Sequence, residues 1–252
     1  MRKNYFLNFF LVYLVLTGCT LDNSEKEISP HRNDLVLGAS ARNFLSDELF
    51  TAINIEIVYV TGHAPTQEAI NSLYTFFERN THKPNGVFIQ TRAISSPDVG
   101  SYSLEEIKEV EKKYRTAFSV DNSLAVFIFF ADNKSQKNKE DTNILGTAYM
   151  NTSIAVFDSV IQSMSGSRSE IQTVTLHHEF GHLFGLVDNG TPAQSDHEDS
   201  DPEYKAHCNV DGCLMAAKID VKSSPLSFLE NGVKILEFGE KCKLDLKANG
   251  GK

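Results

Sequence analysis

Residues 177–188 read His-His-Glu-Phe-Gly-His-Leu-Phe-Gly-Leu-Val-Asp. His178 and His182 are four positions apart, and on an α-helix such residues lie on one face with their Cβ atoms about 5–6 Å apart. Two imidazoles placed in this way can bind one metal ion from the same side. Glu179, next to the first histidine, can accept a proton from a water molecule at that ion. Gly185 can end the helix, because glycine adopts a positive φ without steric cost.

The residues around this motif have the pattern of a largely buried helix. Ser167 and Glu170 are expected to form a capping box at its start. A short His-Glu-x-x-His pattern also arises by chance, so its interpretation depends on this helical context and on the glycine together. The apolar positions opposite the histidines can pack against a sheet, and they are Leu176, Phe180, Leu183 and Val187.

The pattern His178-Glu179-x-x-His182-x-x-Gly185 resembles the zinc-binding signature of the metzincins. The resemblance implies Zn²⁺ as cofactor, two of its ligands in His178 and His182, and Glu179 as the general base that activates zinc-bound water to hydrolyse a peptide bond. Metzincins have a third histidine three residues after the glycine, where this chain has Asp188. The snapalysins, which are similar peptidases, bind zinc through an aspartate at this spacing, so Asp188 is one candidate for the third ligand.

Residues 207–215, His-Cys-Asn-Val-Asp-Gly-Cys-Leu-Met, give a second candidate. They resemble the archaemetzincin segment in which a ligand histidine directly precedes Cys-x4-Cys-x-Met, although an intervening segment, residues 188–206, separates them here from the first motif. We favour His207 as the third ligand, with Asp188 close behind it. His197 of the intervening segment is the third candidate, and it could equally be an ordinary loop residue with no role at the metal. The resemblance also implies that Met215 is the Met-turn methionine beneath the zinc, and an ordinary core methionine is the alternative.

The cysteines of this region have two interpretations. The archaemetzincin resemblance implies that Cys208 and Cys213 bind a second metal. The later Cys-x-x-Cys pair of that family is incomplete in this chain, because Gly239 occupies the position of its first cysteine and only Cys242 remains. Disulfides are stable outside the cytoplasm. We therefore predict a disulfide between Cys208 and Cys213, which would fasten the intervening segment to the Met-turn.

The N-terminus has the parts of an export signal. A basic start is followed by an apolar run at residues 5–16, which is shorter than the roughly 20 residues of a membrane-spanning helix. Residues 16–19, Leu-Thr-Gly-Cys, resemble the bacterial lipobox. This resemblance implies a lipoprotein signal peptide at residues 1–18, a diacylglycerol on Cys19, and an exported chain anchored to the inner or outer membrane of a bacterium. The alternative is an uncleaved anchor helix with a chance cysteine.

Residues 19–50 are polar at first and are predicted to carry the lipid anchor and a tether, and residues 51–252 are predicted to form the catalytic domain. Strands are expected at residues 53–60, 86–94, 124–130, 144–150 and 153–157, and helices at 65–80, 103–118 and within 223–246. This order predicts an α/β fold, with packed helices on a mixed, mostly parallel twisted sheet. A metzincin-like (zincin) fold has this form, with an active-site helix and a Met-turn. The strand at 153–157 is expected at an edge, where an extended peptide could pair with it.

Composition limits the function. Hydrophobic residues make up 41% and charged residues 23%, which predicts a packed domain, and the net charge of −9 argues against nucleic acid as a partner. We predict a zinc metalloendopeptidase that acts on a peptide or protein, in an oligomeric state that the sequence leaves open. The alternatives are a lipid-anchored binding protein on a metzincin scaffold with a non-catalytic zinc, and a zinc hydrolase of non-peptide bonds. Glu179 favours an enzyme, because a purely structural zinc site needs no base.

Overall fold

The computed structural model describes Met1 and residues 31–140, 143–217 and 236–252. The predicted signal peptide, Cys19, most of the predicted tether and most of the predicted helix within 223–246 lie outside these residues. In the described part of the chain, no helix is long and apolar enough to cross a membrane.

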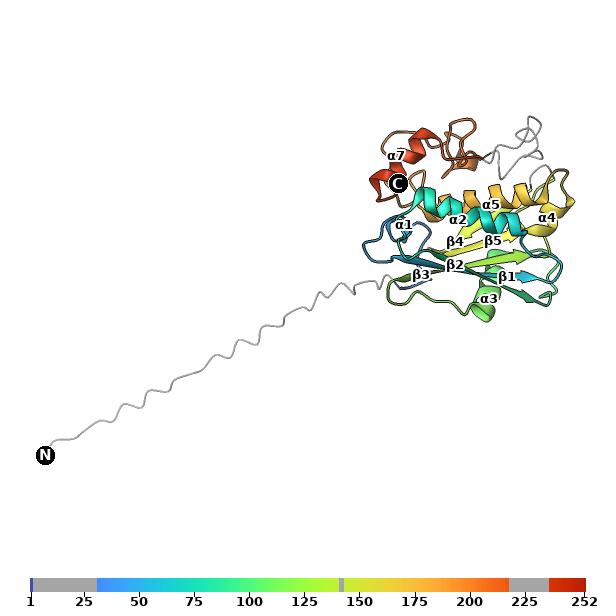
Figure 1. The fold of residues 1–252 in the computed structure, drawn as a ribbon, viewed down its shortest axis with the longest axis horizontal. Helices are drawn as coiled ribbons and strands as arrows, with labels where there is room; N and C mark the ends of the chain where they lie inside the picture. The colour runs from blue at the N-terminus through green and yellow to red at the C-terminus, as the bar shows by residue number, and fades with distance from the viewer. Residues whose placement is uncertain (2–30, 141–142, 218–235) are drawn as a thin grey trace.

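A five-stranded sheet forms the centre of the fold (Figure 1). Its strands are parallel except for the antiparallel strand β4 at one edge. This arrangement confirms the predicted α/β fold with a mixed, mostly parallel sheet. The strands, in spatial order, are β2 (Val87–Ile94), β1 (Ala52–Val60), β3 (Ser123–Ala131), β5 (Ser153–Phe157) and β4 (Gly146–Tyr149).

The strand expected at the edge, residues 153–157, lies inside the sheet. It is β5, which pairs with β3 on one side and with β4 on the other, so β4 is the edge strand. All five residues of β5 are buried, whereas Thr147 and Ala148 of β4 are half-buried. The expectation was wrong because β4 and β5 follow each other as a hairpin, and the sequence does not show which of the two pairs with β3.

Helices cover both faces of the sheet (Figure 1). Helices α2 (Gln67–Asn80) and α5 (Arg168–Leu183) lie side by side on one face, and α3 (Leu104–Tyr114) lies on the other. The short helix α4 (Asp158–Ser163) leads from β5 to α5. On α5, Leu176, Phe180 and Leu183 are fully buried, as the apolar stripe predicted. Phe180 packs against Phe77 of α2, so the sheet and α2 together hold α5 by its apolar side.

The start of α5 differs from the prediction. The Ser167 side chain does not cap the helix, so the expected capping box with Glu170 does not form. Its hydroxyl instead lies 3.0 Å from the hydroxyl of Ser169. The burial of α5 against the sheet and α2 stabilises this helix without the cap.

The folded domain begins before residue 51. Residues 41–50, which were assigned to the tether, include the helix α1 (Ala41–Leu45) and bury Phe44, Leu45 and Phe50 completely. The Lys83 ammonium donates hydrogen bonds to the carbonyl groups of Asn43, Ser46 and Phe50. The tether prediction therefore extended too far along the chain, since these apolar side chains belong to the core.

Candidate metal centre and active-site cleft

Helix α5 presents the two histidines of the first motif on one face. The Nε2 atoms of His178 and His182 are 3.1 Å apart, and both residues are buried. Gly185 follows the end of the helix with φ +70, as predicted. The N–H of Gly185 donates to the His182 carbonyl and that of Leu186 to the Gly181 carbonyl, which satisfies the last turn and reverses the chain.

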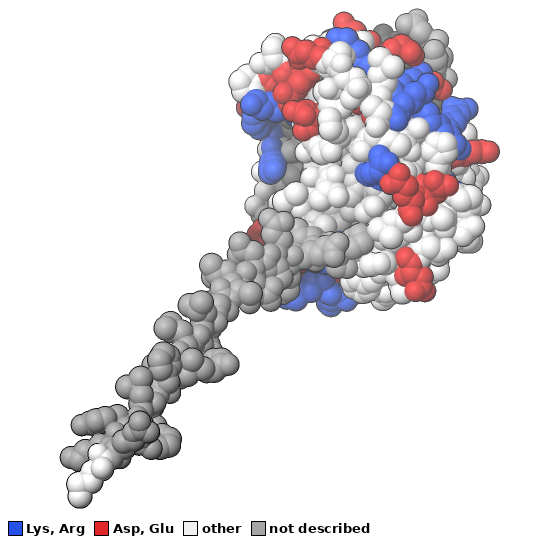
Figure 2. All heavy atoms as spheres, turned by 90° about the vertical axis from the view of Figure 1, so that its left-hand side faces the viewer, with Lys and Arg blue, Asp and Glu red and all other residues white. Residues whose placement is uncertain are grey.

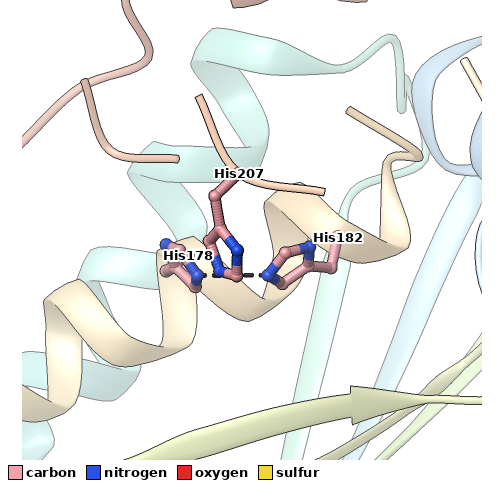
Figure 3. A group of neighbouring side chains, drawn as sticks. All are labelled: His178, His182 and His207. Atoms are coloured by element: carbon pink, nitrogen blue, oxygen red, sulfur yellow. Dashed lines mark hydrogen bonds between the residues drawn. The ribbon is translucent and has the colours of Figure 1, made fainter. Parts of the chain in front are cut away.

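A third histidine completes the group from a loop above α5 (Figure 3). The ring centroid of His207 lies 5.3 Å from that of His178 and 5.0 Å from that of His182. One nitrogen from each ring lies within 4.8 Å of the others. Three imidazoles around one tetrahedral zinc ion place their nitrogens about 3.3 Å apart. The donor set therefore fits zinc after a small closing movement.

The structure does not bring Asp188 to this group. Val187 and Asp188 both have positive φ, 59° and 58°, in the tight turn after Gly185. This turn leaves Asp188 exposed to solvent, while the chain continues to His207. Of the candidate third ligands, only His207 lies beside the two helical histidines in the described residues.

The carboxylate of Glu179 extends from α5 to the edge strand β4. Its Oε2 accepts a hydrogen bond of 2.6 Å from the N–H of Ala148 in β4. The strand approaches closely because Gly146 has no side chain: a methyl group there would lie 2.7 Å from Glu179 Oε1. This backbone contact, which fixes the carboxylate beside the edge of the sheet, could not be predicted from a local sequence pattern.

An open cleft runs along β4 to the histidines. Its volume is ≈ 990 Å³, within the range of ligand-binding sites. Glu179, His182 and His207 line it together with β4. Apolar residues from two further parts of the chain complete its wall, and they include Leu35, Leu37, Leu104 and Ile107. A ligand in this cleft would reach both the base and the candidate metal centre.

The segment around Met215 forms the floor beneath the histidines. Met215 is fully buried, and a methyl group on Gly181 would lie 2.2 Å from its sulfur, so the thioether packs against α5 between the two histidines. The Nδ1–H of His178 donates to the Leu214 carbonyl at 2.7 Å, because a carbonyl oxygen can only accept. This bond places the lone pair of His178 on Nε2, the atom that faces His182.

His177 points away from the metal group, into the contact between α5 and α2. Its ring stacks on Phe76 with centroids 4.2 Å apart, and its Nε2 lies 3.2 Å from the hydroxyl of Ser72. Burial lowers the pKa of His177 to about 3, so the ring is neutral at physiological pH. His177 is therefore a packing residue that helps to hold α5 in place.

The predicted disulfide between Cys208 and Cys213 is absent: Cys208, Cys213 and Cys242 are free and buried. Cys208 and Cys242 lie beside His197, the histidine placed third among the candidate zinc ligands, and these three residues form one group with Cys213 next to it. His197 Nδ1 lies 3.3 Å from Cys208 Sγ and 3.8 Å from Cys242 Sγ. Cys213 Sγ lies 3.6 Å from Cys242 Sγ. A tetrahedral zinc ion sets such sulfur–sulfur and sulfur–nitrogen separations at about 3.5–3.8 Å.

Hydrogen bonds orient the members of this second cluster. The other nitrogen of His197, Nε2, lies 2.6 Å from the fully buried carboxylate of Asp245. The pKa of the Cys213 thiol is well below its usual range, because the Cys208 and Cys242 thiols, and then the N–H groups of Gly239 and Met215, donate to its sulfur. A histidine held by a carboxylate and a sulfur held by N–H groups are typical of metal sites.

These features define an α/β domain with a three-histidine group on a buried helix. No protein-family model and no curated protein sequence matches the chain. Among solved structures, it is similar to archaemetzincin from Methanopyrus kandleri, with TM-score 0.50 and 16% identity over 79% of this chain and 96% of that one. A second similar structure is metalloproteinase-II from Bacteroides fragilis, with TM-score 0.43 and 13% identity over 82% of this chain and 56% of that one. The likeness to archaemetzincin shows a shared fold.

Proposed function

We propose that this chain is a zinc-dependent peptidase. The observation that carries the proposal is the convergence of His178, His182 and His207 beside Glu179 in an open cleft. Three imidazoles are the donor set of a catalytic zinc site that keeps a fourth position for water or substrate. The metzincin-like pattern of the sequence and the fold shared with archaemetzincin support the same conclusion.

Each part of the site has its own role in the proposed hydrolysis. Zinc, when bound by the three histidines, supplies a Lewis acid that activates water and polarises the substrate carbonyl. Glu179 accepts the proton of the attacking water and returns it to the leaving amine. The N–H of Ala148 holds the carboxylate of Glu179 in place during both transfers.

The edge strand supports a peptide as the substrate. As the edge of the sheet, β4 can pair with an extended peptide along the cleft. Peptide pairing was expected at residues 153–157, and we now propose it for the edge strand Gly146–Tyr149. A peptide paired with β4 would have its backbone next to Glu179 and the metal centre.

Glu179→Gln tests the proposal. We expect this variant to bind zinc as the wild type does, since Glu179 is not a ligand, and to lose activity on a peptide library by roughly 10²- to 10⁴-fold. Zinc analysis and cleavage assays measure the two effects. Glu170→Gln, in the first turn of the same helix, is the matched control and should change neither. Wild-type cleavage by Glu179→Gln would refute the proposal, and so would a zinc-loaded wild type that cleaves no peptide.

A further inference from the structure

The second cluster contains Cys208, which directly follows His207 of the first centre in the sequence. We propose that His197, Cys208, Cys213 and Cys242 bind a second zinc ion, and that this ion positions the ligands of the first centre. The inference rests on the proposed function for the existence of the first centre. Its new content is the use of a histidine from the intervening segment as a ligand, and the coupling between the two ions.

The donor set fits a closed, structural zinc site. Three sulfurs and one imidazole nitrogen are a common four-ligand set for structural zinc. All four residues are buried, with His197 only 1% and Cys242 0% exposed. The imidazole turns Nδ1 toward the sulfurs because Asp245 binds its Nε2. The site therefore joins the intervening segment to the C-terminal helix α7 (Glu240–Ala248), which carries Cys242 and Asp245.

One connection runs through the backbone of His207. Its neighbour, Cys208, belongs to the second cluster, and the Cys208 N–H donates to the Met215 carbonyl at 2.7 Å. The segments that carry His197 and His207 also pair: Asp199 N–H donates to the His207 carbonyl and Asn209 N–H to the His197 carbonyl, both at 2.8 Å. An ion that joins His197 to Cys208 would fix this pair of segments, and His207 with it.

The other connection runs through Leu214. It follows Cys213, and its carbonyl accepts the hydrogen bond from His178 Nδ1. An ion bound by Cys213 would therefore fix the group that orients His178. Between the end of α5 and residue 217, the regular structure consists of the 3-10 turn η1 (Pro202–Tyr204) and the bridge between Glu198 and Cys208. Because this region has so little regular secondary structure, we expect the second ion to stabilise its shape.

Metal binding by the full chain tests the coupling. We expect two zinc ions per wild-type chain. Cobalt substitution distinguishes the centres, because a thiolate gives Co²⁺ an intense charge-transfer band and an imidazole does not. His207→Ala should lose one ion and keep the band. Cys242→Ser should lose the band. Chelator competition should also show that the first centre of this variant binds zinc about 10- to 100-fold more weakly, which is the usual effect of losing a group that orients a metal ligand.

Two further variants complete the design. Asp245→Asn keeps every ligand of both centres, so it should fold, as circular dichroism can check, and still weaken zinc binding in the first centre. His82→Gln, at an exposed histidine outside both clusters, should change neither ion. Unchanged first-centre affinity in both Cys242→Ser and Asp245→Asn would overturn the coupling. A wild type with one ion, no charge-transfer band and a disulfide among these cysteines would overturn the second site.

The test also separates this inference from the proposed function. A chain that binds both ions with the expected coupling but cleaves no peptide refutes the peptidase and leaves the inference standing. A chain that cleaves peptides, and whose first centre binds zinc equally tightly in Cys242→Ser, in Asp245→Asn and in the wild type, refutes the coupling and leaves the peptidase standing.

Discussion

At the scale of single residues, the third histidine decides how the first centre is built. His207→Ala should lower the zinc affinity of this centre by removing a ligand, whereas Asp188→Ala should leave it unchanged, because Asp188 is exposed and outside the cluster. Zinc analysis after dialysis against a weak chelator measures both. The result that would contradict this assignment is loss of zinc in Asp188→Ala alone.

A buried carboxylate far from the metal centre predicts a pH dependence of stability. Burial by itself raises the pKa of Glu56, but donation by the Thr116 hydroxyl and by the N–H groups of Ala117 and Thr116 outweighs it, so the net pKa lies below the ordinary value of 4.5. A carboxylate with a lowered pKa stabilises the fold above its unfolded pKa, and this stabilisation is lost as the pH falls through the folded pKa.

Glu56→Gln should therefore lower the free energy of unfolding by about 2 kcal/mol at neutral pH. Below pH 4.5, the ordinary value, the gap to the wild type should shrink as the wild-type carboxylate becomes protonated. Urea unfolding at a series of pH values measures the gap. Glu105→Gln, at an exposed residue of α3, is the control and should leave the stability unchanged. A gap independent of pH would mean that side-chain shape, and not charge, stabilises this site.

At the scale of elements, the sequence predicted regular segments well where local pattern decides them. Residues 124–130 form an apolar run and lie within the central strand β3, and the Ser103 cap starts α3. Strand order depends on contacts between distant segments, so the edge position was assigned to β5 and not to β4. The short helix α1 was missed because five residues show no clear helical period, and only tertiary packing stabilises it.

Helix α1 predicts where the domain can be cut. A chain that begins at Thr51 lacks Phe44, Leu45 and Phe50, and each lost core side chain costs about 2–5 kcal/mol. The total approaches the whole stability of a typical domain, about 5–15 kcal/mol. We expect a chain from Thr51 not to unfold cooperatively in urea and a chain from His31 to do so. Equal unfolding midpoints for the two would show that α1 is dispensable.

At the scale of the whole molecule, both clusters combine segments that are far apart in the sequence. The helical spacing identified His178, Glu179 and His182, because one turn of α5 places them. No local rule connects His207 to α5 across the intervening segment, so only a family resemblance favoured it over Asp188. For Cys208 and Cys213 we preferred a disulfide to the second metal that the resemblance implied, because the spacing of two nearby cysteines gives no indication of a distant histidine.

The surface charge fits the negative net charge. On the face in Figure 2, the Lys and Arg side chains of the described residues lie among Asp and Glu side chains. Phosphate binding needs a continuous basic surface. The expectation that nucleic acid is not a partner stays a prediction from the net charge of the sequence.

The attachment of the whole chain to a membrane is our last prediction. We propose that a diacylglycerol on Cys19 anchors it, because two acyl chains give stable binding where one gives only marginal binding. His31, where the described domain begins, is 12 residues from Cys19, so the domain would lie within about 40 Å of the bilayer. Cys19→Ser should move the protein from the membrane to the soluble fraction, while the wild type should resist high salt, because its anchor is apolar. Ser24→Ala is the control in the tether. A Cys19→Ser protein that stays in the membrane fraction after residues 1–18 have been removed would exclude the lipid anchor.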